Sequence, residues 1–120
     1  MAEAVAVFTR EHGVSEQDAS AIHLVLEETV ANVILYGYRD AREHTIDVTL
    51  SIHGPDVILT VEDDATPFNP LLTPPPELDK PLEERPIGGL GIHLVRSMMD
   101  DVQYARQDGH NILTMRKRLP

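Results

Sequence analysis

The sequence predicts an α+β fold, a two-layer sandwich with helices on one face of a mixed sheet. Two segments with helical spacing come first, two pairs of alternating segments follow, and a third helical segment separates those pairs. A chain of 120 residues with 42% hydrophobic residues can bury one core, so residues 1–120 are predicted to form a single domain.

Two helices are predicted at the beginning of the chain. Residues 2–12 form the first, and Gly13 stands where a helix commonly ends. Ser15 is the predicted N-cap of the second helix, which continues to about Tyr36 before Gly37 stops it. The apolar residues of this second helix keep helical spacing: Ile22, Val25, Leu26, Val30 and Val33.

Two antiparallel hairpins are predicted from alternating apolar residues and turn signals. Residues 45–53 alternate as a half-buried strand does, with apolar side chains at Ile46, Val48, Leu50 and Ile52. A turn at residues 54–56 leads to a second strand at 57–62. The second hairpin comprises strands 102–106 and 112–117 around a turn at 108–111.

A proline-rich segment separates the two hairpins. Residues 64–87 contain seven of the nine prolines, and proline removes backbone donors that helices and central strands need. A loop of this length in a small domain is typically a functional lid or a linker, and too little chain follows it for a second domain. The third predicted helix begins after it and has an apolar face of Ile92, Val95 and Met99.

The charge balance and the missing cysteines exclude several classes of function. There are 20 acidic and 10 basic residues, a formal net charge of −10, so the surface repels nucleic-acid phosphates and anionic lipids. The chain has no cysteine, and we find no apolar run near the ~20 residues of a membrane span. We therefore expect a cytoplasmic protein that binds neither nucleic acid nor membrane directly.

Three groups of residues could carry chemistry. Glu28 and Asn32 stand four apart on one face of the second predicted helix, where a carboxylate can accept a proton and an amide oxygen can bind magnesium. Asp63 ends a predicted strand, where it could accept a hydrogen bond from a base amine. The glycines of residues 88–91 open a helix whose first backbone amides could contact phosphate.

Each group also has a purely structural interpretation. Glu28 and Asn32 could belong to a solvated polar face, Asp63 to an ordinary turn, and the glycines to a tight connection. The dinucleotide fingerprint and the Walker P-loop are both absent from the sequence. The order of the three groups nevertheless favours a nucleotide site, since together they supply a magnesium ligand, a base acceptor and a phosphate-binding helix start.

Three stretches of the chain resemble the N, G1 and G2 boxes of the histidine kinase/Hsp90-like ATPase superfamily, whose nucleotide-binding domain has the Bergerat fold. They are LEETVANVILYGY, VEDDATPFNP and PLEERPIGGLGIHLVRSMMDDVQYARQDGHNILTMRKRL. Within this superfamily the chain is most similar to the small anti-sigma serine kinases of bacterial partner-switching systems. The resemblance covers about residues 22–117, and the combination of boxes is far more specific than any one of them.

The resemblance implies roles for the candidate residues. Glu28 would be the catalytic base and Asn32 the magnesium ligand. Asp63 would hold the adenine amine, with Ala65 beside the base. Asn111 would occupy a last-strand position whose polar residue often contacts adenine through water.

The resemblance also implies how the phosphates are held. Residues 69–87 would form a proline-rich ATP lid over the site. Gly89 and Gly91 would contact the phosphates, with Gly88 beside them.

Two departures from the family pattern stand out. The G1 box usually reads Asp-x-Gly, and Ala65 replaces its glycine, which lowers affinity if that backbone needs a positive φ or a close approach to adenine. Family members also usually begin with a strand that is not readable here. An unpaired sheet edge would favour association, and the family suggests a homodimer.

The function that the resemblance implies is a Mg-ATP-dependent serine/threonine protein kinase that regulates transcription. Its substrate would be an anti-sigma factor antagonist of the STAS type, and it could also sequester a sigma factor. One alternative is an ATP-dependent regulatory binding module with little or no kinase activity. Two others are a detached histidine-kinase ATPase domain, which lacks a preceding phosphoacceptor helix, and a structural domain without nucleotide, which Ala65 would favour.

Overall fold

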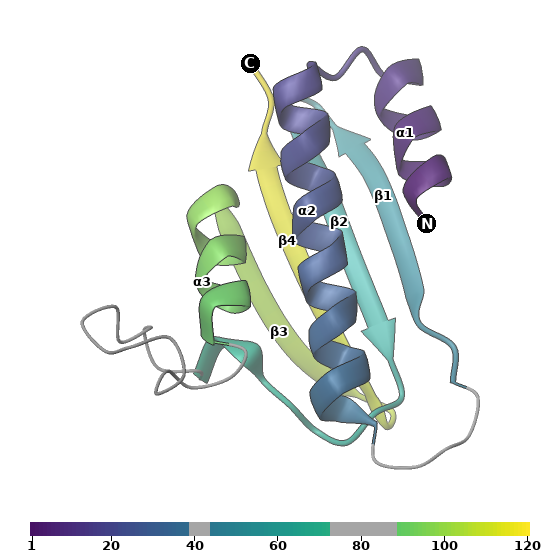
Figure 1. Cartoon of the computed structure of the whole chain (residues 1–120), viewed down its shortest axis with the longest axis vertical. Helices are drawn as coiled ribbons and strands as arrows, with labels where there is room; N and C mark the ends of the chain where they lie inside the picture. Colours follow the sequence, from purple (N-terminus) through teal and green to yellow (C-terminus); the bar gives the residue numbers. More distant parts are fainter. Residues whose placement is uncertain (39–43, 73–88) are drawn as a thin grey trace.

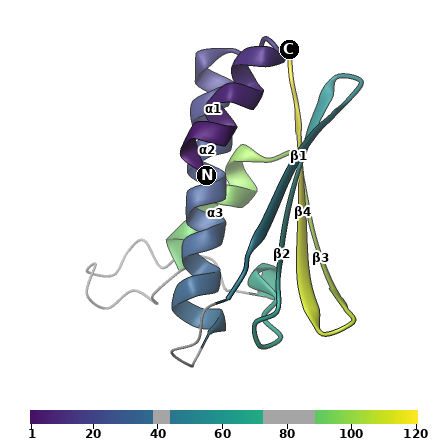
Figure 2. The same ribbon diagram turned by 90° about the vertical axis from the view of Figure 1, so that its right-hand side faces the viewer.

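The computed structural model describes residues 1–38, 44–72 and 89–120 as two layers, helices packed on a four-stranded sheet (Figure 1). The view along the sheet in Figure 2 shows α1, α2 and α3 on the same face. The elements follow in the order α1 (Ala2–Glu11), α2 (Glu16–Asn32), β1 (Asp47–His53), β2 (Asp56–Asp63), α3 (Gly89–Met98), β3 (Asp101–Gln107) and β4 (His110–Arg118). The predicted α+β sandwich is confirmed.

The sheet has the strand order β1-β2-β4-β3, and every pairing among the described strands is antiparallel. The prediction of a mixed sheet is therefore wrong. The connection through α3 does bring β3 back parallel to β2, since both strands are antiparallel to β4. Because β4 turns back between them, these two parallel strands never become hydrogen-bonded neighbours.

The helix signals near the N-terminus are confirmed. Gly13 follows α1 with a φ of 66°, the left-handed conformation that commonly ends a helix. The Ser15 side chain accepts a hydrogen bond from the Asp18 backbone N–H at 3.2 Å, as an N-cap does. The second helix continues beyond Asn32 as a π-helical turn, Val33–Gly37, a feature that often occurs at functional sites.

The long second helix resembles a membrane span in length and composition. Residues Glu16–Gly37 are long and apolar enough, by length and composition alone, to cross a bilayer, a run that we did not find in the sequence. In the fold this helix lies against the sheet, and Ile22, Val25 and Leu26 are fully buried there. The core of the sandwich therefore accounts for these three apolar residues, whereas Ile34 and Leu35 at the end of the helix are exposed.

The core fills the space between the two layers. On β2 the side chains of Val57, Leu59 and Val61 are buried, and on β4 those of Leu113 and Met115 face the same way. Both alternating patterns end in a buried polar residue, Asp63 on β2 and Asn111 on β4. The strand register places these two residues directly opposite each other. The sheet itself therefore brings a carboxylate and an amide together at one end of the core.

The second hairpin turns more tightly than the sequence predicts. Asp108 and Gly109 have positive φ values of 51° and 79°, which makes a two-residue turn of the kind that Asp-Gly favours. The predicted turn at 108–111 is therefore too long, and Asn111 lies within β4. Of the predicted lid, residues 70–72 form a short 3-10 turn, while residues 73–87 and Gly88 lie outside the described residues.

Candidate nucleotide-binding site

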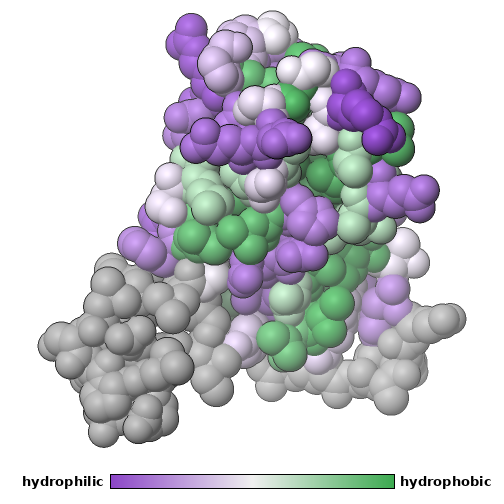
Figure 3. All heavy atoms as spheres, turned by 45° about the horizontal axis from the view of Figure 1, so that its top comes forward, coloured by the Kyte–Doolittle hydropathy of each residue, from purple (hydrophilic) through white to green (hydrophobic). Residues whose placement is uncertain are grey.

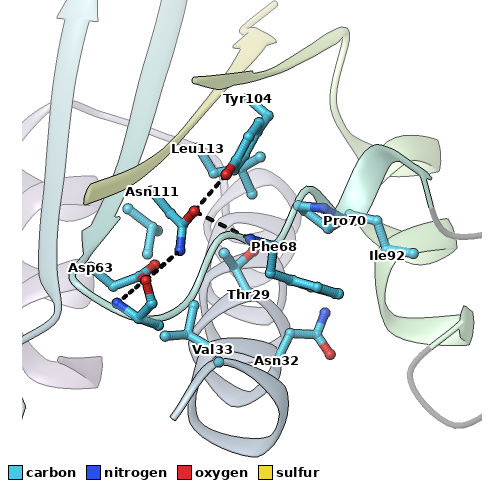
Figure 4. A pocket seen from close by; sticks show the side chains of 13 residues that line it. Thr29, Asn32, Val33, Asp63, Phe68, Pro70, Ile92, Tyr104, Asn111 and Leu113 are labelled. Atoms are coloured by element: carbon cyan, nitrogen blue, oxygen red, sulfur yellow. Dashed lines mark hydrogen bonds between the residues drawn. The ribbon is translucent and has the colours of Figure 1, made fainter. Parts of the chain in front are cut away.

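A pocket opens between α2, the end of β2, the segment that follows β2 and the inner face of the second hairpin (Figure 4). Four of the candidate site residues singled out in the sequence line it: Asn32, Asp63, Ala65 and Asn111. Its apolar lining consists of Val33, Val61, Phe68, Pro70, Ile92 and Leu113. Apolar walls with a few placed polar groups are typical of small-molecule sites.

Asp63 is held at the end of β2 by two donors on one carboxylate oxygen. Its Oδ1 accepts a hydrogen bond from the Ala65 backbone N–H at 3.0 Å and another from Asn111 Nδ2 at 2.9 Å. No hydrogen bond from a described residue reaches Oδ2. The residue is only 4% exposed and lines the pocket, so Oδ2 is the acceptor that a ligand could use.

Asn111 is the centre of a hydrogen-bonded cluster in the pocket wall. Figure 4 shows it between Asp63 on one side and Tyr104 of β3 on the other. The Tyr104 hydroxyl donates to Asn111 Oδ1 at 2.5 Å, and Asn111 Nδ2 donates to the Thr66 carbonyl at 2.9 Å. The cluster ties the segment after β2 to the second hairpin.

Ala65 occupies the position where the G1 box usually has glycine, and the structure explains why alanine fits. Its φ is not positive, so its backbone does not need glycine. A Cβ built on Gly37 would lie 2.8 Å from the Ala65 Cβ, closer than side chains approach each other. Gly37 therefore leaves room for the Ala65 methyl group. The sequence suggests a helix stop at Gly37, whereas the structure shows a steric reason for the glycine.

Glu28 and Asn32 face the beginning of α3. A Cβ built on Gly91 would lie 2.8 Å from Glu28 Oε2, 3.6 Å from Asn32 Nδ2 and 3.8 Å from Asn32 Oδ1. A side chain at position 91 would displace the Glu28 carboxylate from its present position, so glycine lets this carboxylate lie close to the first turn of α3. Gly89 is the first residue of α3. Two of the three candidate groups, the helical pair and the glycines, therefore meet where α2 and α3 approach each other.

Several residues of the site were not predicted from the sequence. Thr29, Phe68 and Tyr104 line the pocket, and Arg106 of β3 donates from Nη1 to the Ala65 carbonyl at 2.8 Å. Thr29 lies one position after Glu28 on α2, but its hydroxyl donates to the Val25 carbonyl at 2.8 Å. Strand alternation could have placed Tyr104 on the inner face. The contact of Arg106 with the segment after β2 depends on the fold alone.

A second polar cluster lies beside the pocket. The Tyr38 hydroxyl donates to Asp64 Oδ1 at 2.8 Å, and the His44 ring stacks on Tyr38 with centroids 3.8 Å apart. Desolvation and the hydrogen bond to Asp64 raise the pKa of Tyr38 to about 12. The same hydrogen bond lowers the pKa of Asp64 below its ordinary value. The cluster links the end of the π-helical turn to the residue next to Asp63.

Comparison with known families agrees with this geometry. Residues 1–117 match the family described as the histidine kinase-like ATPase domain. The chain belongs to this family. The resemblance to the histidine kinase/Hsp90-like ATPase superfamily is thereby confirmed, and the two-layer fold is the Bergerat fold of that superfamily.

Solved structures show the same fold. The blue-light activated histidine kinase of Erythrobacter litoralis EL346 matches with a TM-score of 0.63 and 18% identity, over 88% of this chain and 32% of that one. The Acinetobacter baumannii histidine kinase AdeS matches with a TM-score of 0.56 and 20% identity, over 84% of this chain and 47% of that one.

Curated relatives include serine kinases. The serine-protein kinase RsbW of Bacillus mycoides is 26% identical over 106 residues, 84% of this chain and 65% of the relative. The serine/threonine-protein kinase BtrW of Bordetella bronchiseptica is 28% identical over 92 residues, 77% of this chain and 65% of the relative. The chain therefore spans about two thirds of the length of these relatives.

Proposed function

We propose that this chain binds Mg-ATP and transfers the γ-phosphoryl group to a serine or threonine of an anti-sigma factor antagonist of the STAS type. The observation that carries the proposal is the meeting of Glu28 and Asn32 with Gly91 beside a pocket that contains Asp63. The relatives named serine-protein kinases support the same class of reaction.

In this proposal each residue acts at one part of the nucleotide. Asp63 Oδ2 accepts a hydrogen bond from the adenine amine, and the Ala65 methyl packs against the base. Gly88, Gly89 and Gly91 let the backbone at the start of α3 come close to the phosphates, where the helix N-terminus favours negative charge. Residues 69–87 would close over the site as a lid, and residues 1–120 would function as one ATPase domain.

Magnesium fits the residues present only if the nucleotide supplies part of its coordination. The described residues contain no group of three His, Cys, Asp or Glu side chains that could hold a metal ion. Asn32 offers one amide oxygen near the start of α3, and magnesium commonly binds through one or two protein groups, phosphates and water. Bound there, the ion would neutralise phosphate charge in a chain whose net charge is −10.

The transfer step needs a base and an aligned acceptor. The hydroxyl oxygen of the substrate attacks the γ-phosphorus, the bond from that phosphorus to the β–γ bridging oxygen breaks, and ADP leaves with the electron pair. Glu28 accepts the hydroxyl proton. Its carboxylate lies against Gly91, so it is close to where the phosphates would be held.

The first test is ATP binding by calorimetry with and without magnesium. Wild type should bind in a magnesium-dependent way, and Asn32→Ala should lose that dependence. Phosphorylation of a candidate antagonist encoded nearby should then require Glu28. Glu28→Gln should abolish transfer and keep ATP binding, while Glu27→Gln, an exposed neighbour paired with His23 at 2.9 Å, should change neither. Transfer by Glu28→Gln would refute the assigned base.

A second candidate function, an ATP-dependent binding module with little catalysis, is favoured by an exposed apolar pair. Ile34 and Leu35 on the π-helical turn are 57% and 67% exposed, next to Val33 in the pocket wall. Figure 3 shows hydrophobic residues at the surface below a mostly hydrophilic top. A sigma factor could bind such a surface. ATP-dependent capture of a sigma factor without phosphate transfer would favour this function.

Three further features belong to the proposal, the first and third because of composition and charge and the second because the family suggests it. They are a cytoplasmic location, a homodimer and the absence of direct nucleic-acid binding. Sedimentation of the purified chain at several concentrations tests the second of them.

A further inference from the structure

The Asn111 side chain has no hydrogen-bonding capacity left for a ligand. Its two amide hydrogens reach Asp63 Oδ1 and the Thr66 carbonyl, each at 2.9 Å. Its oxygen accepts from the Tyr104 hydroxyl at 2.5 Å and from the Phe68 backbone N–H at 3.4 Å. An asparagine side chain offers two donors and two lone pairs, so all four are used inside the protein.

Two of these partners fix which way the amide points. The Thr66 carbonyl can only accept, so the atom facing it must be Nδ2. The Phe68 backbone N–H can only donate, so the atom facing it must be Oδ1. The Tyr104 hydroxyl therefore donates to Oδ1, and an N–H group of Asn111 is directed at Asp63.

This arrangement determines what Asp63 presents to the pocket. Both partners of its Oδ1 are donors, the Ala65 N–H at 3.0 Å and the Asn111 amide at 2.9 Å. They hold the carboxylate in one orientation and leave Oδ2 as the acceptor beside the cavity. A ligand with a donor at this position can form a hydrogen bond to Asp63 Oδ2. A ligand with an acceptor at this position would leave its own acceptor and Oδ2 facing each other without a hydrogen bond.

We propose that Asn111, oriented by Tyr104, is a positioning residue that sets the base preference of the site by fixing Asp63 as an acceptor for a 6-amino purine. The inference rests on the proposed nucleotide binding. It assigns Asn111 a role through Asp63 in place of a contact with the base. Arg106 of β3 also donates to the Ala65 carbonyl in the segment after β2. Residues of the second hairpin therefore hold both Asp63, at the end of β2, and the segment that follows it.

The experiment compares the Kd of ATP with that of inosine triphosphate, which has a 6-oxo group in place of the amine. Wild type should bind the inosine nucleotide about tenfold or more weakly, the factor expected when a buried acceptor is left unpaired. Asn111→Leu keeps the size of the side chain and removes its four hydrogen bonds. The ratio of the Kd for inosine triphosphate to the Kd for ATP should therefore fall roughly tenfold. Tyr104→Phe removes one hydroxyl and should lower the ratio by about threefold.

Thr114→Ala is the matched control. Thr114 lies on β4 like Asn111 but is not among the residues on its buried face, so the ratio should stay at the wild-type value. If the role of Asn111 is purely structural, Asn111→Leu would weaken the binding of both nucleotides equally and leave the ratio of Kd values unchanged. That result overturns the inference. If Asn111→Leu does not fold, an unchanged ratio in Tyr104→Phe overturns it instead. Failure of wild type to bind either nucleotide refutes the proposed function and this inference with it.

Discussion

The contact between Gly37 and Ala65 can be tested by exchanging the two residues. The structure leaves 2.8 Å between the Ala65 Cβ and a Cβ built on Gly37, so Gly37→Ala must push the π-helical turn away from the pocket. Overpacking of this kind costs about 1–3 kcal/mol. Ala65→Gly removes a buried methyl group and adds backbone freedom, which together cost about 1–2 kcal/mol.

The double variant, Gly37→Ala with Ala65→Gly, should be more stable than the sum of the single changes predicts. The methyl group introduced at position 37 would occupy the space vacated at position 65, so little is lost in packing and the two glycine effects cancel. We expect the double variant to lie within about 1 kcal/mol of wild type, which corresponds to a coupling of roughly 1–5 kcal/mol between the two positions.

Urea denaturation followed by circular dichroism measures the free energy of unfolding of wild type, the two single variants and the double variant. The m-values should agree, so that differences in midpoint report stability. Coupling below about 0.5 kcal/mol would mean that the two positions are independent, and the steric explanation of Ala65 would then be wrong. ATP binding should survive in the double variant, since one methyl group still fills this corner of the pocket.

Three further predictions concern the scaffold around the site. Leu59→Ala, at a fully buried position of β2, should lower the free energy of unfolding by about 2–5 kcal/mol in urea denaturation, and a loss below about 1 kcal/mol would contradict the assigned core. Ser15→Ala should cost about 1 kcal/mol by the same assay, while Ser15→Asp, which keeps a cap, should cost much less. The pKa of Tyr38 is raised from 10.0 to about 12, so its contribution to stability is complete below about pH 10 and is lost as the pH rises toward 12. Tyr38→Phe should remove that part of the dependence of stability on alkaline pH, and Tyr36→Phe should not. If the free energy of unfolding of wild type and of Tyr38→Phe changes equally with pH in this range, Tyr38 is not the group responsible.

Local signals in the sequence were sufficient for most of the scaffold. The Ser15 cap, the left-handed Gly13 and the alternation on β2 each depend on residues within a few positions of one another. The prediction of a mixed sheet was wrong because strand neighbours are decided by where the hairpin after α3 docks. Nothing within a strand encodes its place in that order.

The candidate site divides in the same way. The order of Glu28, Asn32, Asp63 and the glycine cluster could be read from the sequence. Their packing could not, because Gly91 and Glu28, which approach each other between α2 and α3, are 63 positions apart in sequence.

By itself, the sequence determined which segments become helices and strands and which side chains could bind a nucleotide, because propensity, capping and alternation act over short distances. The tertiary structure alone decided three things: that Asn111 stands opposite Asp63, that Tyr104 and Arg106 reach the segment after β2, and that Gly37 leaves space for Ala65. Each of these depends on strand register and on the close approach of distant backbones. These are fixed only when the two layers pack together.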